Sequence, residues 1–317
     1  MEYAQVKGFN YQPSYGSSGF ELWRKFDAKI VAEELGRGTR YFPSMNAIRV
    51  WLSWDAFIRE PPQFAAHFER LLEIADTYQL RVMPVLFNRW HIPDLDYGGI
   101  YIDHFLPTVS WVQKDRMFEP YLDAIVGEHA HDDRVFAWDL CNEPFSYSCA
   151  ASDIPDITEA ENRWLTGLYE ACKRLRAVAP VTIGTHPNDG RAGLERVEPI
   201  SDILSIHPYY IPSRHSKQAY EQLLDDYVAV ASTAQKPLLG TETCWGALDD
   251  DDRVSIIQYT LGELAKRRIG WLVYLLHHSL IADAHRPAFG PVGEPGNLAF
   301  IEADGSLRPG HEVFNHF

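Results

Sequence analysis

The sequence predicts that residues 1–317 form a single (β/α)8 barrel, and three observations support this fold. Short apolar runs alternate with longer segments of helical periodicity, and eight such runs occur along the chain. Neither of the nucleotide-binding motifs G-x-G-x-x-G and G-x-x-x-x-G-K-[ST] follows the first apolar run. Nearly continuous apolar strands that alternate with helices are typical of a parallel sheet covered on both faces. Eight such units in a chain of 317 residues favour a closed barrel over an open nucleotide-binding sheet.

Four strands and three helices are predicted in the first half of the chain. Residues 64–75 carry apolar side chains at i, i+4, i+7, i+8 and i+11, the stripe of an amphipathic helix with one buried face. Gly36 and Gly38 follow an earlier helical segment and are expected to end it. The predicted strands are residues 6–11, 47–52, 80–87 and 135–140, and the predicted helices are residues 20–35, the segment around 64–75, and a segment with Tyr121, Leu122, Ile125 and Val126 on one side.

The second half continues the alternation of strands and helices. Residues 188–199 show the weakest helical periodicity of the connecting segments, although a helix is expected there too. Residues 300–306 are predicted to form a short hairpin before a C-terminal helix. The remaining predicted strands are residues 180–185, 202–207, 236–242 and 269–276, and the remaining helices are residues 159–178, 220–234 and 254–267.

Composition and charge exclude several classes of function. Acidic residues outnumber basic ones 44 to 29, the formal net charge is −15, and no basic stripe is present, so nucleic acid is not a predicted partner. No apolar run is long enough to cross a bilayer, and the first residues lack the pattern of a signal peptide. We therefore expect a cytoplasmic protein that does not bind membranes, with secretion as the alternative if a signal peptide has been removed. The four cysteines lack C-x-x-C spacing and are expected to be reduced, with Cys141 and Cys244 as small buried fillers.

Two stretches end a predicted strand with a carboxylate. The run from Trp138 leads into Asn142, Glu143 and Pro144, and residues 237–246 repeat the pattern with Glu242. Proline cannot continue the hydrogen bonding of a strand, so Asn142 and Glu143 are expected where the strand ends. Two carboxyl groups are what cleavage of a glycosidic bond requires, because one is protonated and assists the leaving oxygen while the other is ionised.

In a barrel, the C-terminal ends of all strands face one mouth, where active sites lie. The residues predicted at this mouth combine carboxylates, amides, imidazoles and indoles. A sugar requires such a mixture, because its hydroxyl groups need polar partners and its C–H faces stack on aromatic rings. The residues expected there are Asn10, Arg49, Trp51, Trp54, Asn88, Trp90, Asn142, Glu143, His186, His207, Tyr209, Glu242, Trp245, Trp271, Tyr274 and His277.

The motifs at this mouth resemble those of the clan-A retaining glycoside hydrolases and are most similar to family 5, the group of cellulases and mannanases. The resemblance is carried by Asn142-Glu143-Pro144, His207-Pro208-Tyr209 and Glu242. Arg49 matches the arginine of that family, and Asn88-Arg89-Trp90 is similar to the Asn-x-Trp of its mannanase-like members. These positions span predicted strands two to seven, and therefore most of the chain.

The resemblance implies a retaining double displacement with Glu143 as the acid/base and Glu242 as the nucleophile. An inverting mechanism is the alternative if the carboxyl groups are about 6.5–9.5 Å apart rather than about 5–5.5 Å. The implied supporting roles are a donor to the sugar 2-hydroxyl (Asn142), groups that keep the nucleophile ionised (Arg49 and Tyr209) and a neighbour that tunes the acid/base (His207). The predicted substrate-binding residues are Arg49, Asn88, Trp90, Asn142, His207, Tyr209, Trp245 and Trp271.

Two departures from the family leave the substrate open. The family usually has a tryptophan at the end of strand eight, where this chain reads Tyr274-Leu275-Leu276-His277-His278, and many members have histidine where strand three ends in Asn88. The segments 88–115 and 279–297 are long for a compact barrel and are expected to wall the site. Such a pocket favours cleavage from one end or of short oligosaccharides, and the resemblance implies β-linked gluco- or manno-type substrates. β-Galactosidase, β-xylosidase and α-L-arabinofuranosidase activities are the alternatives.

Two other classes of protein remain open. A catalytically silent carbohydrate-binding barrel would need the aromatic residues but not both glutamates. A metal-dependent hydrolase would use His186, His207, His277 and Asp283, but neither H-E-x-x-H nor another fixed ligand frame is present. We therefore predict a carbohydrate substrate and neither a metal nor another cofactor, and make no prediction of the oligomeric state.

Overall fold

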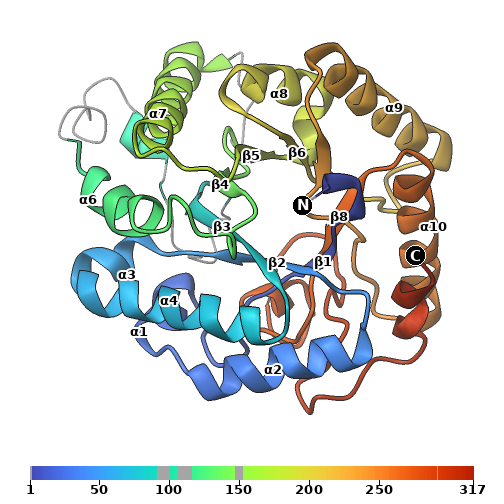
Figure 1. The fold of residues 1–317 in the computed structure, drawn as a ribbon. Helices are drawn as coiled ribbons and strands as arrows, with labels where there is room; N and C mark the ends of the chain where they lie inside the picture. Colours follow the sequence, from blue (N-terminus) through green and yellow to red (C-terminus); the bar gives the residue numbers. More distant parts are fainter. Residues whose placement is uncertain (1, 91–99, 101, 106–115, 147–152, 291) are drawn as a thin grey trace.

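The computed structural model describes residues 2–90, 100, 102–105, 116–146, 153–290 and 292–317. Within these residues, eight parallel strands close into a barrel in the order of the chain, as Figure 1 shows. The predicted (β/α)8 class is therefore confirmed. The strands are β1 (Lys7–Asn10), β2 (Ala47–Trp51), β3 (Arg81–Asn88), β4 (Trp138–Asn142), β5 (Val181–Thr185), β6 (Leu204–Ile206), β7 (Leu238–Gly240) and β8 (Gly270–Val273).

Helices surround the barrel, as seen in Figure 1. The predicted stripe in residues 64–75 is the buried face of α4, and Phe68 on this face packs against Trp138 of β4. Within the described residues, no helix is both long and apolar enough to span a bilayer. The helices are α1 (Gly19–Arg24), α2 (Ala28–Tyr41), α3 (Trp54–Arg59), α4 (Pro61–Thr77), α6 (Glu119–Leu122), α7 (Pro155–Arg174), α8 (Gly190–Val197), α9 (Lys217–Ala234) and α10 (Asp250–Lys266), with a π-helical turn η3 (Asp123–Gly127) after α6 and a 3-10 helix η8 (His311–His316) near the C-terminus.

The predicted helix over residues 20–35 is wrong, because two helices occupy this region and the second runs on to Tyr41. The first helix ends at Arg24, and Asp27 starts the second, since its side chain accepts hydrogen bonds from the backbone N–H groups of Lys29 and Ile30 in the first turn of α2. Gly36 and Gly38 do not end α2. A Cβ atom on Gly36 would lie 2.6 Å from the Tyr78 hydroxyl, so this glycine permits close packing of α2 rather than a turn.

The strand predicted at residues 135–140 lies further along the chain than expected. Val135 forms only an isolated bridge with Val82, and β4 itself begins at Trp138 and ends at Asn142. The amide is therefore the last residue of the strand, and Glu143 is the first residue beyond it. The weakly periodic segment 188–199 does contain a helix, α8, and Ile301 pairs with Leu307 in the hairpin expected near residues 300–306.

The inside of the barrel becomes polar toward the C-terminal ends of the strands. Arg49 of β2 and Asp139 of β4 are fully buried, and they form an ion pair of 2.8 Å. A buried charge is tolerated only when it is paired and hydrogen-bonded. The interior of the barrel therefore changes from apolar to polar at this ion pair.

Candidate active site

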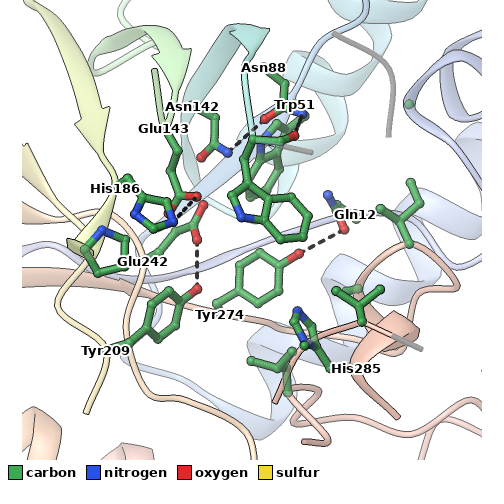
Figure 2. A pocket seen from close by; sticks show the side chains of 18 of the residues that line it. Gln12, Trp51, Asn88, Asn142, Glu143, His186, Tyr209, Glu242, Tyr274 and His285 are labelled. Atoms are coloured by element: carbon green, nitrogen blue, oxygen red, sulfur yellow. Dashed lines mark hydrogen bonds and ion pairs between the residues drawn. The ribbon is translucent and has the colours of Figure 1, made fainter. Parts of the chain in front are cut away.

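Glu143 and Glu242 lie side by side at the mouth of the barrel. Glu143 follows β4, and its backbone N–H donates a hydrogen bond of 2.8 Å to the carbonyl of Gly184 on β5. Glu242 follows β7, and both carboxyl groups are buried. One oxygen of each carboxyl and Nδ1 of His207 all lie within 4.8 Å of one another. Figure 2 shows the two side chains meeting in one cavity, as the sequence predicts.

The backbone at Glu143 adopts an unusual conformation. Its φ of 47° lies in the left-handed region, which residues with a side chain seldom occupy. Such strain persists where the surrounding structure holds the chain, and it is concentrated at functional sites. Here the hydrogen bond to Gly184 holds the residue directly after the strand, and the carboxyl is directed toward Glu242.

The environment of Glu242 favours its charged form. Arg49 Nη1 donates to Glu242 Oε1 at 2.6 Å, and the Tyr209 hydroxyl donates to Oε2 at 2.8 Å. Burial raises the pKa of Glu242 above its ordinary value, while the positive charge of Arg49 and the two hydrogen bonds oppose that rise. Of the two glutamates, Glu242 is therefore the one that carries the negative charge.

The environment of Glu143 favours its protonated form. Burial raises the pKa of Glu143 well above its ordinary value, and the negative charge of Glu242 raises it further. His207 Nδ1 lies 2.7 Å from Glu143 Oε1 and 3.7 Å from Glu242 Oε2. Burial lowers the pKa of His207, so its ring is neutral. The negative charge of Glu242, 3.7 Å from Nδ1, favours a ring hydrogen on that nitrogen, which then donates to Glu143 Oε1. Because His207 donates to Oε1, the acidic proton of Glu143 is carried by Oε2.

Arg49 connects Glu242 to the barrel interior. Its guanidinium donates to Asp139 through Nε and Nη2, at 3.1 and 2.8 Å, and to Asn10 Oδ1 at 3.0 Å. Asp139 in turn accepts from the backbone N–H groups of Cys141 and Gly184. Sequence reasoning missed Asp139, although a charged residue inside an otherwise apolar strand was an available signal.

Asn142 is held in one orientation by its neighbours. Its Oδ1 accepts from Arg49 Nη2 at 2.7 Å, and its Nδ2 donates to Asn88 Oδ1 at 2.9 Å. An amide nitrogen carries two hydrogens, so Nδ2 keeps a second one for a ligand. Asn88 also donates to the carbonyl of Trp90 at 2.7 Å, which ties the end of β3 to the same network.

A cavity of about 340 Å³ opens above the two glutamates. Tyr274, the residue directly after β8, lines it, with the Trp51 ring edge-on at 5.9 Å and the Gln12 Oε1 atom 3.4 Å from its hydroxyl. Figure 2 shows these three side chains on the side of the cavity opposite His186. Gln12 was missed by sequence reasoning, because nothing distinguishes a glutamine two residues after a strand from a surface loop residue. The lining residues are Gln12, Gly19, Leu22, Trp51, Leu52, Ser53, Trp54, Asp55, Leu86, Phe87, Asn88, Trp90, Ile100, Asn142, Glu143, His186, Pro187, Asn188, Tyr209, Ile211, Arg214, His215, Leu223, Glu242, Trp245, Tyr274, Ile281, Ala282, His285, Val292, Gly293, Glu294 and Leu298.

Most predicted site residues lie at this cavity, but Trp271 does not. Trp271 stands near the start of β8, is buried, and packs edge-on against Phe317 at 6.4 Å, so its placement at the mouth is wrong. Arg49 and His207 do not line the cavity either. They lie behind the glutamates and act on them through hydrogen bonds. Trp90 and Trp245 line the cavity, each beside the His285 ring.

The predicted wall of the cavity is described only in part. Val292 and Glu294 from the segment 279–297 line the cavity. Most of the segment 88–115 lies outside the described residues, as does Cys149. The other three cysteines are buried free thiols, and burial raises the pKa of both Cys141 and Cys244.

The residues of the metal-dependent alternative do not converge. His277 contacts Arg37 at 2.8 Å, whereas Asp283 contacts His278 and Arg286. Among the described residues, two groups have ligand atoms close enough to share an ion: Glu69 with His129 and Asp132, and Glu143 with His207 and Glu242. In the first group Arg134 already pairs with both carboxylates, at 2.8 and 2.6 Å. In the second, hydrogen bonds within the group and from its neighbours satisfy the same atoms.

Comparison with known proteins agrees with this geometry. A family model described as cellulase (glycosyl hydrolase family 5) matches residues 42–279. Mannan endo-1,4-β-mannosidase A of Hypocrea jecorina is 27% identical over 174 residues, which cover 53% of this chain and 36% of the relative. The chain thus spans well under half the length of that curated relative.

Two solved structures share the fold at low sequence identity. The exo-β-1,4-mannosidase from Opitutaceae bacterium strain TAV5 superposes with a TM-score of 0.72 at 19% identity, covering 98% of this chain and 58% of that one. The hyperthermostable endo-1,4-β-D-mannanase from Thermotoga petrophila RKU-1 gives a TM-score of 0.65 at 14% identity, covering 98% of each chain. At these identities the likeness extends to the barrel alone.

Proposed function

The chain belongs to glycosyl hydrolase family 5, and from this membership we propose that it cleaves β-linked gluco- or manno-configured glycosides by double displacement, with retention of configuration. The observation that carries the proposal is the unequal environment of two adjacent carboxyl groups. Glu242 receives two hydrogen bonds that stabilise its charge, whereas burial and the neighbouring charge keep Glu143 protonated. Oxygens no more than 4.8 Å apart support a retaining site, in which the carboxyl groups are about 5–5.5 Å apart.

In the first step, Glu242 attacks the anomeric carbon while Glu143 gives its proton to the leaving oxygen. The Glu242 charge is lost as the covalent bond forms, so Glu143 becomes the more acidic group. In the second step, Glu143 accepts a proton from water, which attacks the anomeric carbon and releases Glu242. The second Nδ2 hydrogen of Asn142 is placed to donate to the sugar 2-hydroxyl, because Arg49 and Asn88 fix its amide.

The cavity and the relatives together favour β-mannosides and short substrates. A volume of about 340 Å³ is at the low end for ligand pockets, which suits one or two sugar units better than a long polysaccharide. The named relatives are mannanases and a mannosidase, one of which is exo-acting. We therefore place β-mannosides before β-glucosides, and cleavage at a chain end before cleavage within a chain.

The proposal is tested with nitrophenyl glycosides of β-manno, β-gluco, β-galacto, β-xylo and α-L-arabinofuranosyl configuration. Wild type should release nitrophenol from at least one of them. Glu242→Gly should lose at least about a thousandfold in rate. Azide should restore part of that loss and yield a glycosyl azide of inverted configuration, since the small anion fills the space of the nucleophile.

A matched control comes from the protein surface. Glu195→Ala removes an exposed carboxylate on α8 that pairs with Arg191, and it should match wild type. Undiminished turnover by Glu242→Gly would overturn the nucleophile assignment. A wild-type enzyme that is silent with aryl glycosides and with manno-oligosaccharides would overturn the proposed activity.

A further inference from the structure

His186 stands beside Glu143, with Nε2 3.9 Å from Glu143 Oε2. It directly follows β5, which is the neighbour of β4 in the barrel, and it lines the cavity. The acid/base must face the leaving oxygen. The Glu143 oxygen that His207 does not contact lies toward His186, so we infer that the leaving group departs on this side. The double displacement by Glu242 and Glu143, as proposed above, has no role for His186.

The imidazole of His186 is locked in one tautomer. Its Nδ1 accepts a hydrogen bond of 3.1 Å from the backbone N–H of Asn188, at the start of the 3-10 turn Pro187–Asp189. Burial lowers the pKa of His186 to about 4, so the ring is neutral and carries a single N–H. Because Nδ1 is an acceptor, that hydrogen must be on Nε2.

The Nε2–H group points at the gap beside the acidic proton. Nε2 lies 3.9 Å from Glu143 Oε2, the oxygen that His207 does not contact, and Figure 2 shows the two groups facing each other. This separation is too long for a hydrogen bond. It is short enough for one oxygen atom to lie about 2.7–3.2 Å from both groups at once, the usual hydrogen-bonding distance.

We propose that His186 Nε2–H is a second hydrogen-bond donor to the glycosidic oxygen as it leaves. The inference rests on the proposed function. In this step the bond from the anomeric carbon to the leaving oxygen breaks, the bond to Glu242 forms, and the proton on Glu143 Oε2 moves to the leaving oxygen. His186 keeps its proton throughout and stabilises the negative charge that develops on that oxygen before the proton has fully moved.

Two substitutions separate this role from the capping of the 3-10 turn. His186→Asn keeps an acceptor near the Nδ1 position for the Asn188 N–H but has no donor at the Nε2 position. His186→Gln places an amide N–H near the Nε2 position but moves the acceptor away from Asn188. Both are compared with wild type on aryl glycosides of the preferred sugar, whose phenols span a range of leaving-group pKa.

With unsubstituted phenyl glycosides, His186→Asn should lose roughly 10- to 100-fold in kcat/KM, because one donor to a developing charge is missing. With 2,4-dinitrophenyl glycosides, whose leaving group needs little assistance, the loss should be under about twofold. His186→Gln should recover most of the loss on the phenyl substrate.

The leaving-group dependence separates the possible failures. Two results would show that His186 only orders the 3-10 turn. One is an equal loss of kcat/KM on both substrates, and the other is a fully active His186→Asn with an impaired His186→Gln. Either result would overturn the inference and leave the proposed function intact. A wild-type enzyme inactive on every glycoside would overturn both.

Discussion

At the scale of single residues, Arg49 and Tyr209 decide which glutamate carries the charge. Both donate to Glu242, at 2.6 and 2.8 Å, and neither donates to Glu143. The two carboxyl groups therefore differ in protonation although both are buried. The difference in partners, more than the difference in position, gives each glutamate its chemical role.

Removing the Tyr209 hydroxyl should change the pH profile. Tyr209→Phe deletes one hydrogen bond to the charged form of Glu242, so the pKa of Glu242 should rise. Activity requires ionised Glu242, so the pKa that defines the acid limb of the kcat/KM profile should rise by about one to two pH units. At pH values below this pKa, kcat/KM of the variant should be roughly 10- to 100-fold lower than that of wild type. Tyr210→Phe is the matched control, since Tyr210 packs against Tyr220 and Tyr259. An acid limb that stays in place would contradict the assignment.

Asp139 should be needed for folding as well as for the site. Asp139→Asn removes one of the two negative charges that the fully buried Arg49 faces, and breaking a buried pair in this way costs about 3–5 kcal/mol of unfolding free energy. Asp133→Asn provides the comparison, because Asp133 is 88% exposed and 3.8 Å from Arg81, and such pairs contribute under about 1 kcal/mol. Urea unfolding measures both, and equal losses would refute this account of Asp139.

The sequence predicted those site residues that belong to a motif at the end of an apolar run, but not the residues outside such motifs. Glu143, Glu242, Asn142 and Tyr209 stand at strand ends that the apolar runs identify. Gln12 meets Tyr274 at the cavity because β1 and β8 are neighbours in the closed barrel. The sequence around Gln12 does not show that these two strands are adjacent. Trp271 was misplaced because a strand's length fixes which of its residues reach the mouth, and β8 ends at Val273.

At the scale of elements, periodicity predicted the strands and most helices, whereas the helix boundaries depended on contacts between distant segments. The sequence predicts that Gly36 ends a helix, but this glycine lies inside α2, where its lack of a side chain permits close packing against Tyr78. The helix α3 has only six residues, too few for a periodic pattern to stand out. The end of β4 could not be fixed from sequence because Val135, which begins the apolar run, pairs only through an isolated bridge.

Two glycines in different elements should respond oppositely to the same substitution. A Cβ atom on Gly270 of β8 would lie 2.0 Å from the carbonyl oxygen of Tyr3, so Gly270→Ala should cost about 3 kcal/mol or more of unfolding free energy. Gly167 of α7 has nothing within 4 Å of that position, so Gly167→Ala should stabilise by about 0.5–1 kcal/mol. Thermal unfolding of both variants checks this prediction, and destabilisation by Gly167→Ala would contradict the open space beside Gly167.

At the scale of the whole molecule, the buried Glu143 makes the free energy of unfolding depend on pH. Glu143 has a raised pKa in the folded protein, so its stabilising contribution is complete below the ordinary carboxyl pKa and is lost as the pH rises through the raised value. Glu143→Gln stays neutral at every pH. Its melting temperature should therefore exceed that of wild type by more at pH 9 than at pH 5, and an equal difference at both pH values would count against a protonated Glu143.

The central claim is that Glu242 and Glu143 act in a double displacement, and the configuration of the first product tests it most directly. The measurement is ¹H NMR of the anomeric proton during the first minutes of hydrolysis of the preferred aryl β-glycoside. The account predicts that the β-anomer of the sugar appears first and that the α-anomer grows in only as mutarotation proceeds. An α-anomer that appears first would mean a single displacement by water, and would contradict the nucleophilic role of Glu242.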